Sequence, residues 1–131
     1  IDAADHDDAV AAVSHLPALL SAALMRVAAG EHLWPLGASG FRDTSRLAGS
    51  DPRMMLDILL TNRAAVLEAL RAYESELATV HLALEAGDEV ALAEWLAAAQ
   101  VKYAAYRRFK SAEPLATAPR PFAEKRPGEI A

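Results

Sequence analysis

The sequence predicts an all-α protein: a helical bundle with a kinked first helix and a long antiparallel helical hairpin, able to form a dimer. Apolar residues recur at helical spacing along most of the chain, while prolines and glycines divide it into segments. No segment alternates β-branched and polar residues as a strand would. The 131 residues suit one domain, and the 53% hydrophobic content is enough to build a core.

The first helix is expected over residues 5–28, ending near Gly30. Pro17 falls in its middle. Proline lacks an amide hydrogen and crowds the carbonyl four residues back, here that of Val13, so we expect a kink at this point.

The residues after this helix are expected to form a loop and then two more helical segments. Residues 31–40 contain several turn formers and are predicted as a loop, and a short helix follows over residues 43–48. Asp51-Pro52 has the pattern of an N-cap followed by proline at the first helical position. The helix that starts there is expected to reach Ala86, with a break near Thr61-Asn62 because an unbroken rod would be long for a small domain.

Two heptad seams predict the hairpin. The first seam has spacing 4-3-4-3-4 and consists of Val66, Leu70, Tyr73, Leu77, Val80 and Leu84. Gly87-Asp88 supplies a C′ glycine and an N-cap between the helices. The second seam consists of Leu92, Leu96, Ala99, Tyr103 and Tyr106. Because these helices carry more apolar surface than one small bundle covers, we expect a homodimer.

Two parts of the chain differ in composition. Residues 1–110 are expected to form the helical domain, and residues 111–131, rich in proline and charge, a disordered tail or a linker. Because the chain opens on Ile1 rather than methionine, we expect it to be part of a longer protein.

Charge and composition exclude several classes of partner. The net charge of −5 argues against nucleic acid, and the lack of cysteine fits a cytoplasmic protein. No apolar run reaches the roughly 18 residues of a membrane span, so no membrane partner is expected. His6 and His15 are nine residues apart, on opposite faces of a helix, so no metal site is expected.

Residues 40–52 are the strongest candidate for a binding site. A guanidinium binds carboxylates bidentately, so Arg46 is either a carboxylate ligand or the partner of Asp43 or Asp51 in a structural ion pair. Asp43 lies three residues before Arg46, on the same helical face, and either orients its guanidinium or caps the short helix. Arg42 is expected to be a solvated surface charge.

His15 is the second candidate. It lies two residues before Pro17, where the kink frees backbone carbonyls. It either contacts a substrate carboxylate or forms a hydrogen bond with one of these carbonyls in the core. His6 and Asp7 near the helix start have the alternative interpretation of ordinary N-terminal residues favoured by the helix dipole, which is the stronger interpretation for His6.

Several short motifs together resemble the C-terminal half of the prephenate dehydrogenase family. They are His6-Asp7, Ser14-His15-Leu16-Pro17, Gly40-Phe41-Arg42-Asp43-Thr44-Ser45-Arg46-Leu47-Ala48 and the run from Ser50 to Ile58. The resemblance covers about residues 5–110. It implies oxidative decarboxylation of prephenate to 4-hydroxyphenylpyruvate, or of arogenate to tyrosine, with NAD or NADP bound mainly by an N-terminal domain outside this sequence. The helical domain would form the homodimer and close over the substrate.

The resemblance also implies roles for individual residues. Arg46 would hold a substrate carboxylate, Asp43 and Asp7 would belong to the surrounding polar network, and His15 would form the pocket wall. Met55 stands at a pocket position where the family has tryptophan, and Ala18 replaces its second histidine. These two departures leave open the choice among prephenate, arogenate and an amino-substituted analogue, as well as feedback by tyrosine.

The resemblance assigns no catalytic residue to this chain, which alone is expected neither to bind NAD(P) nor to oxidise prephenate. The alternative is a helical homodimerisation domain without chemistry.

Overall fold

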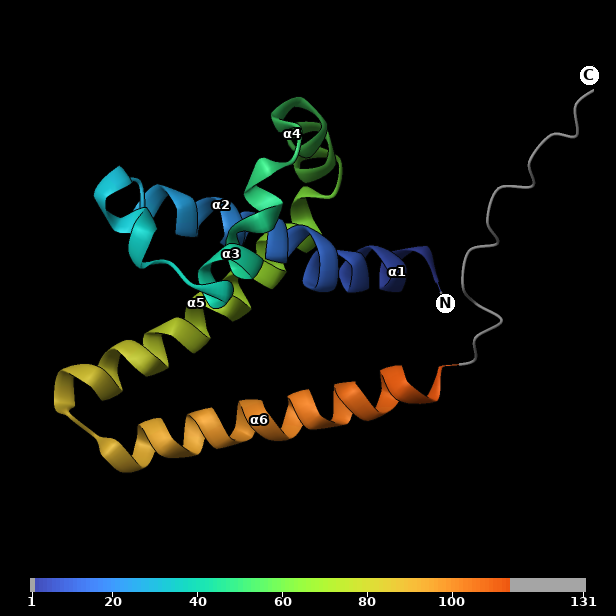
Figure 1. Cartoon of the computed structure of the whole chain (residues 1–131). Helices are drawn as coiled ribbons and strands as arrows, with labels where there is room; N and C mark the ends of the chain where they lie inside the picture. The colour runs from blue at the N-terminus through green and yellow to red at the C-terminus, as the bar shows by residue number, and fades with distance from the viewer. Residues whose placement is uncertain (1, 114–131) are drawn as a thin grey trace, which may run out of the picture. The chain divides into compact units, whose positions relative to one another are not determined.

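The computed structural model describes residues 2–113, and every regular element in that range is helical, which confirms the all-α class (Figure 1). The elements in chain order are α1 (Ala3–Val10), the π-helical turn η1 (Ala11–His15), α2 (Leu16–Val27), the 3-10 helix η2 (Glu31–Leu36), α3 (Ser39–Ser45), the 3-10 turn η3 (Arg46–Gly49), α4 (Pro52–Thr61), α5 (Arg63–Ala86) and α6 (Glu89–Ala112). They form two compact units, Ile1–His81 and Leu82–Ala131, which are described separately.

The predicted kink in the first helix is confirmed, and it takes the form of the π-helical turn η1. Pro17 lies in the first turn of α2, directly after this turn. Proline has no amide hydrogen to offer the carbonyl four residues back, and a π turn pairs amides with carbonyls five residues back instead. The turn therefore adapts the helix to Pro17 without ending it.

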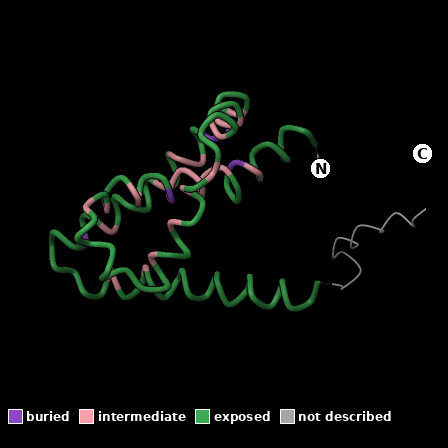
Figure 2. The backbone as a smooth tube through the Cα atoms, turned by 45° about the horizontal axis from the view of Figure 1, so that its top comes forward, coloured by how far each residue is buried: buried purple, intermediate pink, exposed green. Residues whose placement is uncertain are grey.

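The core of the first unit is small. Ala11 is fully buried, and Ala65 and Val66 of α5 are nearly so. Figure 2 shows how few positions are buried and how much of the chain is exposed. The Ser21 hydroxyl is also buried and donates to the Thr44 carbonyl, which holds α2 against α3.

The prediction of a loop over residues 31–40 is wrong for most of its length. Glu31–Leu36 forms the 3-10 helix η2, and α3 already begins at Ser39. The Trp34 indole Nε1 donates to the Ala28 carbonyl at 3.1 Å, tying this segment back to the end of α2. Asp43 is inside α3 and does not cap it, because the N-cap is Ala38.

Helices α4 and α5 begin and end close to the predicted points. The Asp51 carboxylate accepts from the Arg53 amide at 3.0 Å, as expected of an N-cap before Pro52. The predicted break near Thr61-Asn62 is confirmed, since Asn62 is the C-cap of α4. Its backbone bends there, and α5 starts at the next residue.

In the second unit, the predicted turn and α6 are present. Gly87 has φ of 61°, and the Asp88 carboxylate accepts from the Ala91 amide at 3.0 Å. Helix α6 continues to Ala112, two residues into the predicted tail, and the rest of that tail from residue 114 lies outside the described residues. The Lys110 ammonium donates to Glu113 at 3.0 Å, and this carboxylate raises the pKa of Lys110. Seam-to-seam packing of the hairpin stays a prediction.

The expectation about membrane-spanning segments needs correction. Helix Ala3–Val27 contains an 18-residue window of mean hydropathy 1.5 and is long and apolar enough, by length and composition, to cross a membrane. Only 11% of that window is buried. Core helices of soluble proteins have the same composition, and this helix contributes Ala11 to the core and the Ser21 hydrogen bond to α3.

Candidate functional site

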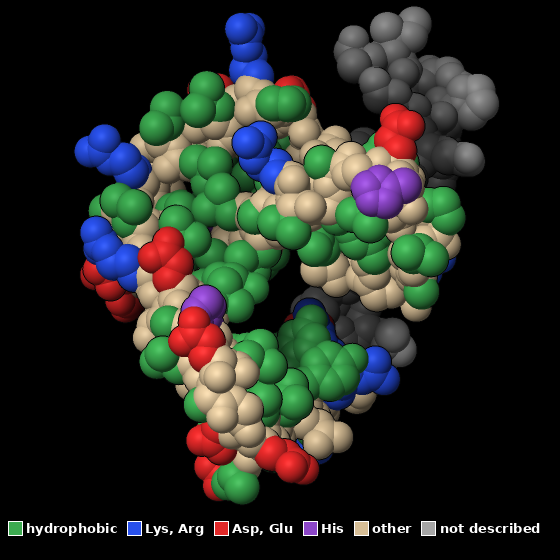
Figure 3. Space-filling model, turned by 90° about the vertical axis from the view of Figure 1, so that its left-hand side faces the viewer, with side chains coloured by type: hydrophobic (Ala, Val, Ile, Leu, Met, Phe, Trp, Pro, Cys, Tyr) green, Lys and Arg blue, Asp and Glu red, His purple; other side chains and the backbone are tan. Residues whose placement is uncertain are grey.

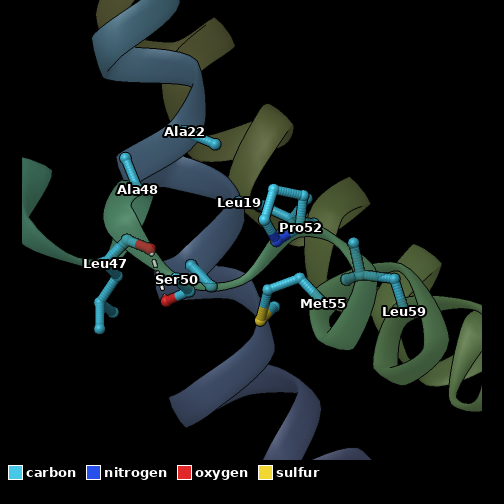
Figure 4. A pocket seen from close by; sticks show the side chains of 9 residues that line it. Leu19, Ala22, Leu47, Ala48, Ser50, Pro52, Met55 and Leu59 are labelled. Atoms are coloured by element: carbon cyan, nitrogen blue, oxygen red, sulfur yellow. Dashed lines mark hydrogen bonds between the residues drawn. The ribbon is translucent and has the colours of Figure 1, made fainter.

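An apolar hollow lies between α2 and the segment formed by η3 and α4 (Figure 4). Its volume is about 210 Å³. It is lined by Ala18, Leu19, Ala22, Leu47, Ala48, Ser50, Pro52, Met55 and Leu59. The Ser50 hydroxyl donates to the Leu47 carbonyl at 2.8 Å and shapes the turn that leads into α4.

A second space, the His15 hollow, adjoins the first and shares four of its lining residues. It has a volume of about 300 Å³ and lies along η1. Its lining is Val13, Ser14, His15, Pro17, Ala18, Leu47, Ser50, Met54, Met55 and Ile58. Because the π turn ends at His15, the kink brings the half-buried imidazole to this wall opposite α4.

A third space, the polar hollow, shares His15 and Ile58 with the second. Its volume is about 340 Å³, and it is lined by His6, Asp7, Val10, His15, Asp57, Ile58, Thr61 and Asn62. His15 therefore lies between the His15 hollow, which is mostly apolar, and the polar hollow, which contains the carboxylates of Asp7 and Asp57.

Asn62 forms a polar junction at this wall. Its amide nitrogen donates to the Asp7 backbone carbonyl at 3.0 Å and is 3.4 Å from His15 Nδ1. From the sequence, Asn62 was expected only to be part of a break between two helices. Its position at a helix end was nevertheless a signal, because the side chain at a C-cap is free to reach residues distant in sequence.

The structure brings three of the five predicted site residues to these hollows. Met55 and His15 line the His15 hollow together, and Asp7 joins His15 in the polar hollow. The Asp7 carboxylate is 3.8 Å from the His6 imidazole. Arg46 and Asp43 are not among the lining residues of the three hollows, although Leu47, next to Arg46, lines two of them.

The structural interpretation of Arg46, an ion pair with Asp43 or Asp51, does not match the structure. Asp43 instead accepts from Nε of the adjacent Arg42 at 3.3 Å, on the exposed surface of α3. Arg42 is exposed as expected, but it is paired. The Arg46 guanidinium is also exposed, and within residues 2–113 it forms neither the ion pair with Asp43 nor the one with Asp51. The role of Arg46 as a carboxylate ligand stays a prediction.

The described residues do not fit a dinucleotide cofactor. Such cofactors are bound where a glycine-rich turn joins a strand to a helix. Residues 2–113 contain no strand, and Gly37, just before α3, and Gly40, inside it, lack the required spacing. In the same range there is no group of three or more His, Cys, Asp or Glu side chains placed to hold a metal ion.

Comparison with known proteins gives one consistent result. Residues 2–98 match the family model described as prephenate dehydrogenase, dimerization domain. Prephenate dehydrogenase of Bacillus subtilis is 34% identical over 89 residues, which are 64% of this chain and 24% of that protein. The chain therefore spans about a quarter of the length of this relative.

Two solved structures are similar over most of the chain. Arogenate dehydrogenase of Synechocystis has a TM-score of 0.76 and 34% identity, over 81% of this chain and 41% of that one. Prephenate dehydrogenase from A. aeolicus, solved with hydroxyphenyl propionate and NAD+, has a TM-score of 0.74 and 29% identity, over 81% and 39% of the two chains.

Proposed function

Because this chain belongs to the prephenate dehydrogenase family, we propose that it is the dimerisation and substrate-binding part of a dehydrogenase acting on prephenate or arogenate. In the reaction on prephenate, the substrate loses carbon dioxide and a hydride passes to NAD+ or NADP+, leaving 4-hydroxyphenylpyruvate. We place this reaction in tyrosine biosynthesis in the cytoplasm. The A. aeolicus relative, solved with NAD+, supports a nicotinamide cofactor in the family.

The fold supports a division of labour between this chain and the part of the enzyme that binds the cofactor. The described residues do not fit a dinucleotide, so we assign the cofactor to another part of a longer chain. Residues 2–113 supply adjoining hollows, and the His15 imidazole lines both the His15 hollow and the polar hollow. We assign to this chain the binding and orientation of the substrate and the exclusion of water from its ring.

The convergence of the family motif residues carries the proposal. His15 of the Ser-His-Leu-Pro motif and Met55 of the Ser-Asp-Pro motif are 40 positions apart, yet they line one hollow. Asp7 of the His-Asp motif lies at the adjoining hollow on the other side of His15. An interaction domain without chemistry would have no need to gather these residues.

Arg46 is the proposed ligand of a substrate carboxylate. Prephenate carries two carboxylates, and a carboxylate leaving water needs a fixed cationic or dipolar partner. The Arg46 guanidinium is not paired with Asp43 or Asp51, and the next residue, Leu47, lines the hollow with His15 and Met55.

The test uses the full-length enzyme that carries this chain, assayed with prephenate and arogenate and with NAD+ and NADP+. Arg46→Ala removes one charge-assisted hydrogen bond of about 1.5–3 kcal/mol and should raise KM about ten- to a hundredfold. Arg42→Ala is the matched control, because it removes an exposed guanidinium four residues away that is paired with Asp43.

Three results would contradict parts of this proposal. Equal effects of the two substitutions on KM would mean that Arg46 is not a substrate ligand. A fall in melting temperature at Arg46→Ala with unchanged kinetics would leave it a structural role. A full-length protein that oxidises neither acid would favour the alternative of a homodimerisation domain without chemistry.

We also propose that the protein is a homodimer. Large apolar side chains of α6 are exposed in the single chain, with Leu96 at 60% and Tyr103 at 58% exposure. Figure 3 shows hydrophobic side chains spread over much of one face among the charged ones. Burial of such surface against a second copy would stabilise the pair by about 25 cal/mol per Å² of apolar area before association costs.

A further inference from the structure

Asn62 joins α1 to the end of the π turn that carries His15. It donates to the carbonyl of Asp7 in α1 and contacts Nδ1 of His15, the last residue of η1. We propose that Asn62 is a positioning residue that fixes the tautomer of the neutral His15 ring, with the proton on Nε2, so that Nε2–H donates to a ligand oxygen in the His15 hollow. The ligand part rests on the proposed function, whereas the tautomer part does not.

The orientation of the Asn62 amide follows from its backbone partner. The Asp7 carbonyl can only accept a hydrogen bond, so the group 3.0 Å from it must be the NH2 of Asn62. The opposite orientation would bring the Asn62 oxygen against the Asp7 oxygen, and two acceptors repel. A main-chain atom, which has no alternative state, thus decides which way the amide faces.

The tautomer of His15 follows from that orientation. The amide nitrogen has two hydrogens, one directed to Asp7 and one available to His15 Nδ1 at 3.4 Å. A neutral imidazole has one nitrogen that donates and one that accepts. When Nδ1 accepts from Asn62, the proton resides on Nε2, and the ring presents an N–H donor.

The Nε2–H group lies on a half-buried ring at the wall shared by two hollows. The structure describes no hydrogen-bond partner for it within residues 2–113. A donor in such a place is suited to an oxygen of the bound molecule, and the carboxylates and hydroxyl of a cyclohexadienyl acid provide oxygens of this kind. We assign this contact to the substrate of the full-length enzyme.

The first test reads the tautomer directly. Nitrogen-15 NMR of histidine-labelled full-length enzyme, with His15→Gln used to assign the signal, should show protonated Nε2 and unprotonated Nδ1. Asn62→Asp replaces the donor by an acceptor and should move the proton toward Nδ1. Thr79→Val, which makes the same kind of change at an exposed position of α5 outside the three hollows, should leave the signal in place. A wild-type signal with the proton on Nδ1, or an unchanged tautomer in Asn62→Asp, would overturn the proposal.

The second test measures the contact with the ligand. Asn62→Leu and His15→Leu should each lower kcat/KM about tenfold or more, because one hydrogen bond to a charged oxygen is lost. His15→Gln keeps an amide donor near the position of Nε2 and should recover part of that loss, while Thr79→Val, at an exposed position of α5 outside the three hollows, should retain wild-type values. If His15→Gln is as impaired as His15→Leu, Nε2–H is not the donor that the ligand uses.

The two tests separate this proposal from the proposed function. A full-length protein inactive on both acids would contradict the function, while the NMR result would still decide the tautomer. If Asn62→Leu only lowers the melting temperature and the His15 signal and kinetics are unchanged, Asn62 merely clamps α1 to the junction of α4 and α5, and the positioning role is refuted.

Discussion

Buried hydroxyl groups have large effects in a core as small as this one. Ser21 is 3% exposed, and its hydroxyl donates to the Thr44 carbonyl, joining α2 to α3 across 23 positions of sequence. Nothing in the sequence around Ser21 marks it, since serine in an Ala- and Leu-rich helix is compatible with an exposed position. Only the packing of α3 against α2 gives this hydroxyl a partner.

At the residue scale, Ser21→Ala is expected to lower the free energy of unfolding by about 1–3 kcal/mol, because it removes the hydrogen bond that the buried Ser21 hydroxyl donates to the Thr44 carbonyl. Urea unfolding followed by circular dichroism measures the change. Ser45→Ala is the control: its hydroxyl donates to the Arg42 carbonyl at 3.4 Å where water can replace it, so the change should stay within about 0.5 kcal/mol. Equal losses in the two variants would show that burial of Ser21 is not the cause.

Helix ends are the features that local sequence predicted best. The N-caps Asp51 and Asp88 and the C-cap Asn62 depend on short-range chemistry, and each is where the sequence placed it. Gly87 is the clearest case, since its φ of 61° lies in the left-handed region that side chains with a Cβ atom disfavour. The turn between α5 and α6 therefore depends on a glycine at position 87 as well as on packing.

At the element scale, Gly87→Ala is expected to cost about 1–2 kcal/mol, because the left-handed conformation strains any residue with a Cβ atom. Hydrogen exchange of the α6 amides and thermal unfolding measure the loss. Gly40→Ala is the matched control, because Gly40 lies within α3 and an added Cβ there meets no atom within 4 Å. It should stabilise by about 0.5–1 kcal/mol. A neutral Gly87→Ala would show that the turn tolerates another backbone conformation.

At the scale of the whole molecule, surface rather than core dominates. The buried hydrophobic residues are few and mostly small, whereas many large ones are exposed, among them Leu96, Tyr103, Tyr106 and Phe109 on α6. The Tyr103 and Tyr106 rings are 6.4 Å apart between centroids and tilted by 40°, so they form a contact along the seam of α6. Exposed apolar surface of this extent is typical of a subunit interface.

The proposed dimer gives a direct test of this surface. Light scattering of the full-length protein at low micromolar concentration should give twice the mass of one chain, and Leu96→Glu should give one chain mass because a carboxylate is costly to bury. Ala98→Glu adds the same charge two positions along, about 200° around the helix, and should leave the dimer intact. Dissociation by both substitutions, or by neither, would mean that the seam of α6 is not the interface.

The candidate site was only partly predictable from sequence. His15, Asp7 and Met55 were expected together because their motifs resemble one family, and the structure gathers them at adjoining hollows. The spacing of Asp43 and Arg46 allowed an ion pair between them, whereas in the structure Asp43 accepts from the adjacent Arg42 instead. Asn62 was not predicted as a site residue, because its partners are 47 and 55 positions away.

The sequence alone determined the helical class, the positions of the caps and the kink at Pro17, since each depends on the chemistry of residues within a few positions of one another. Tertiary structure decided what these elements do together. It converted the kink into a π turn with His15 at its end, folded the expected loop into η2 and α3, and gave Asn62 its contacts. Such contacts join residues distant in the chain, and only the packing of the helices determines which side chains meet.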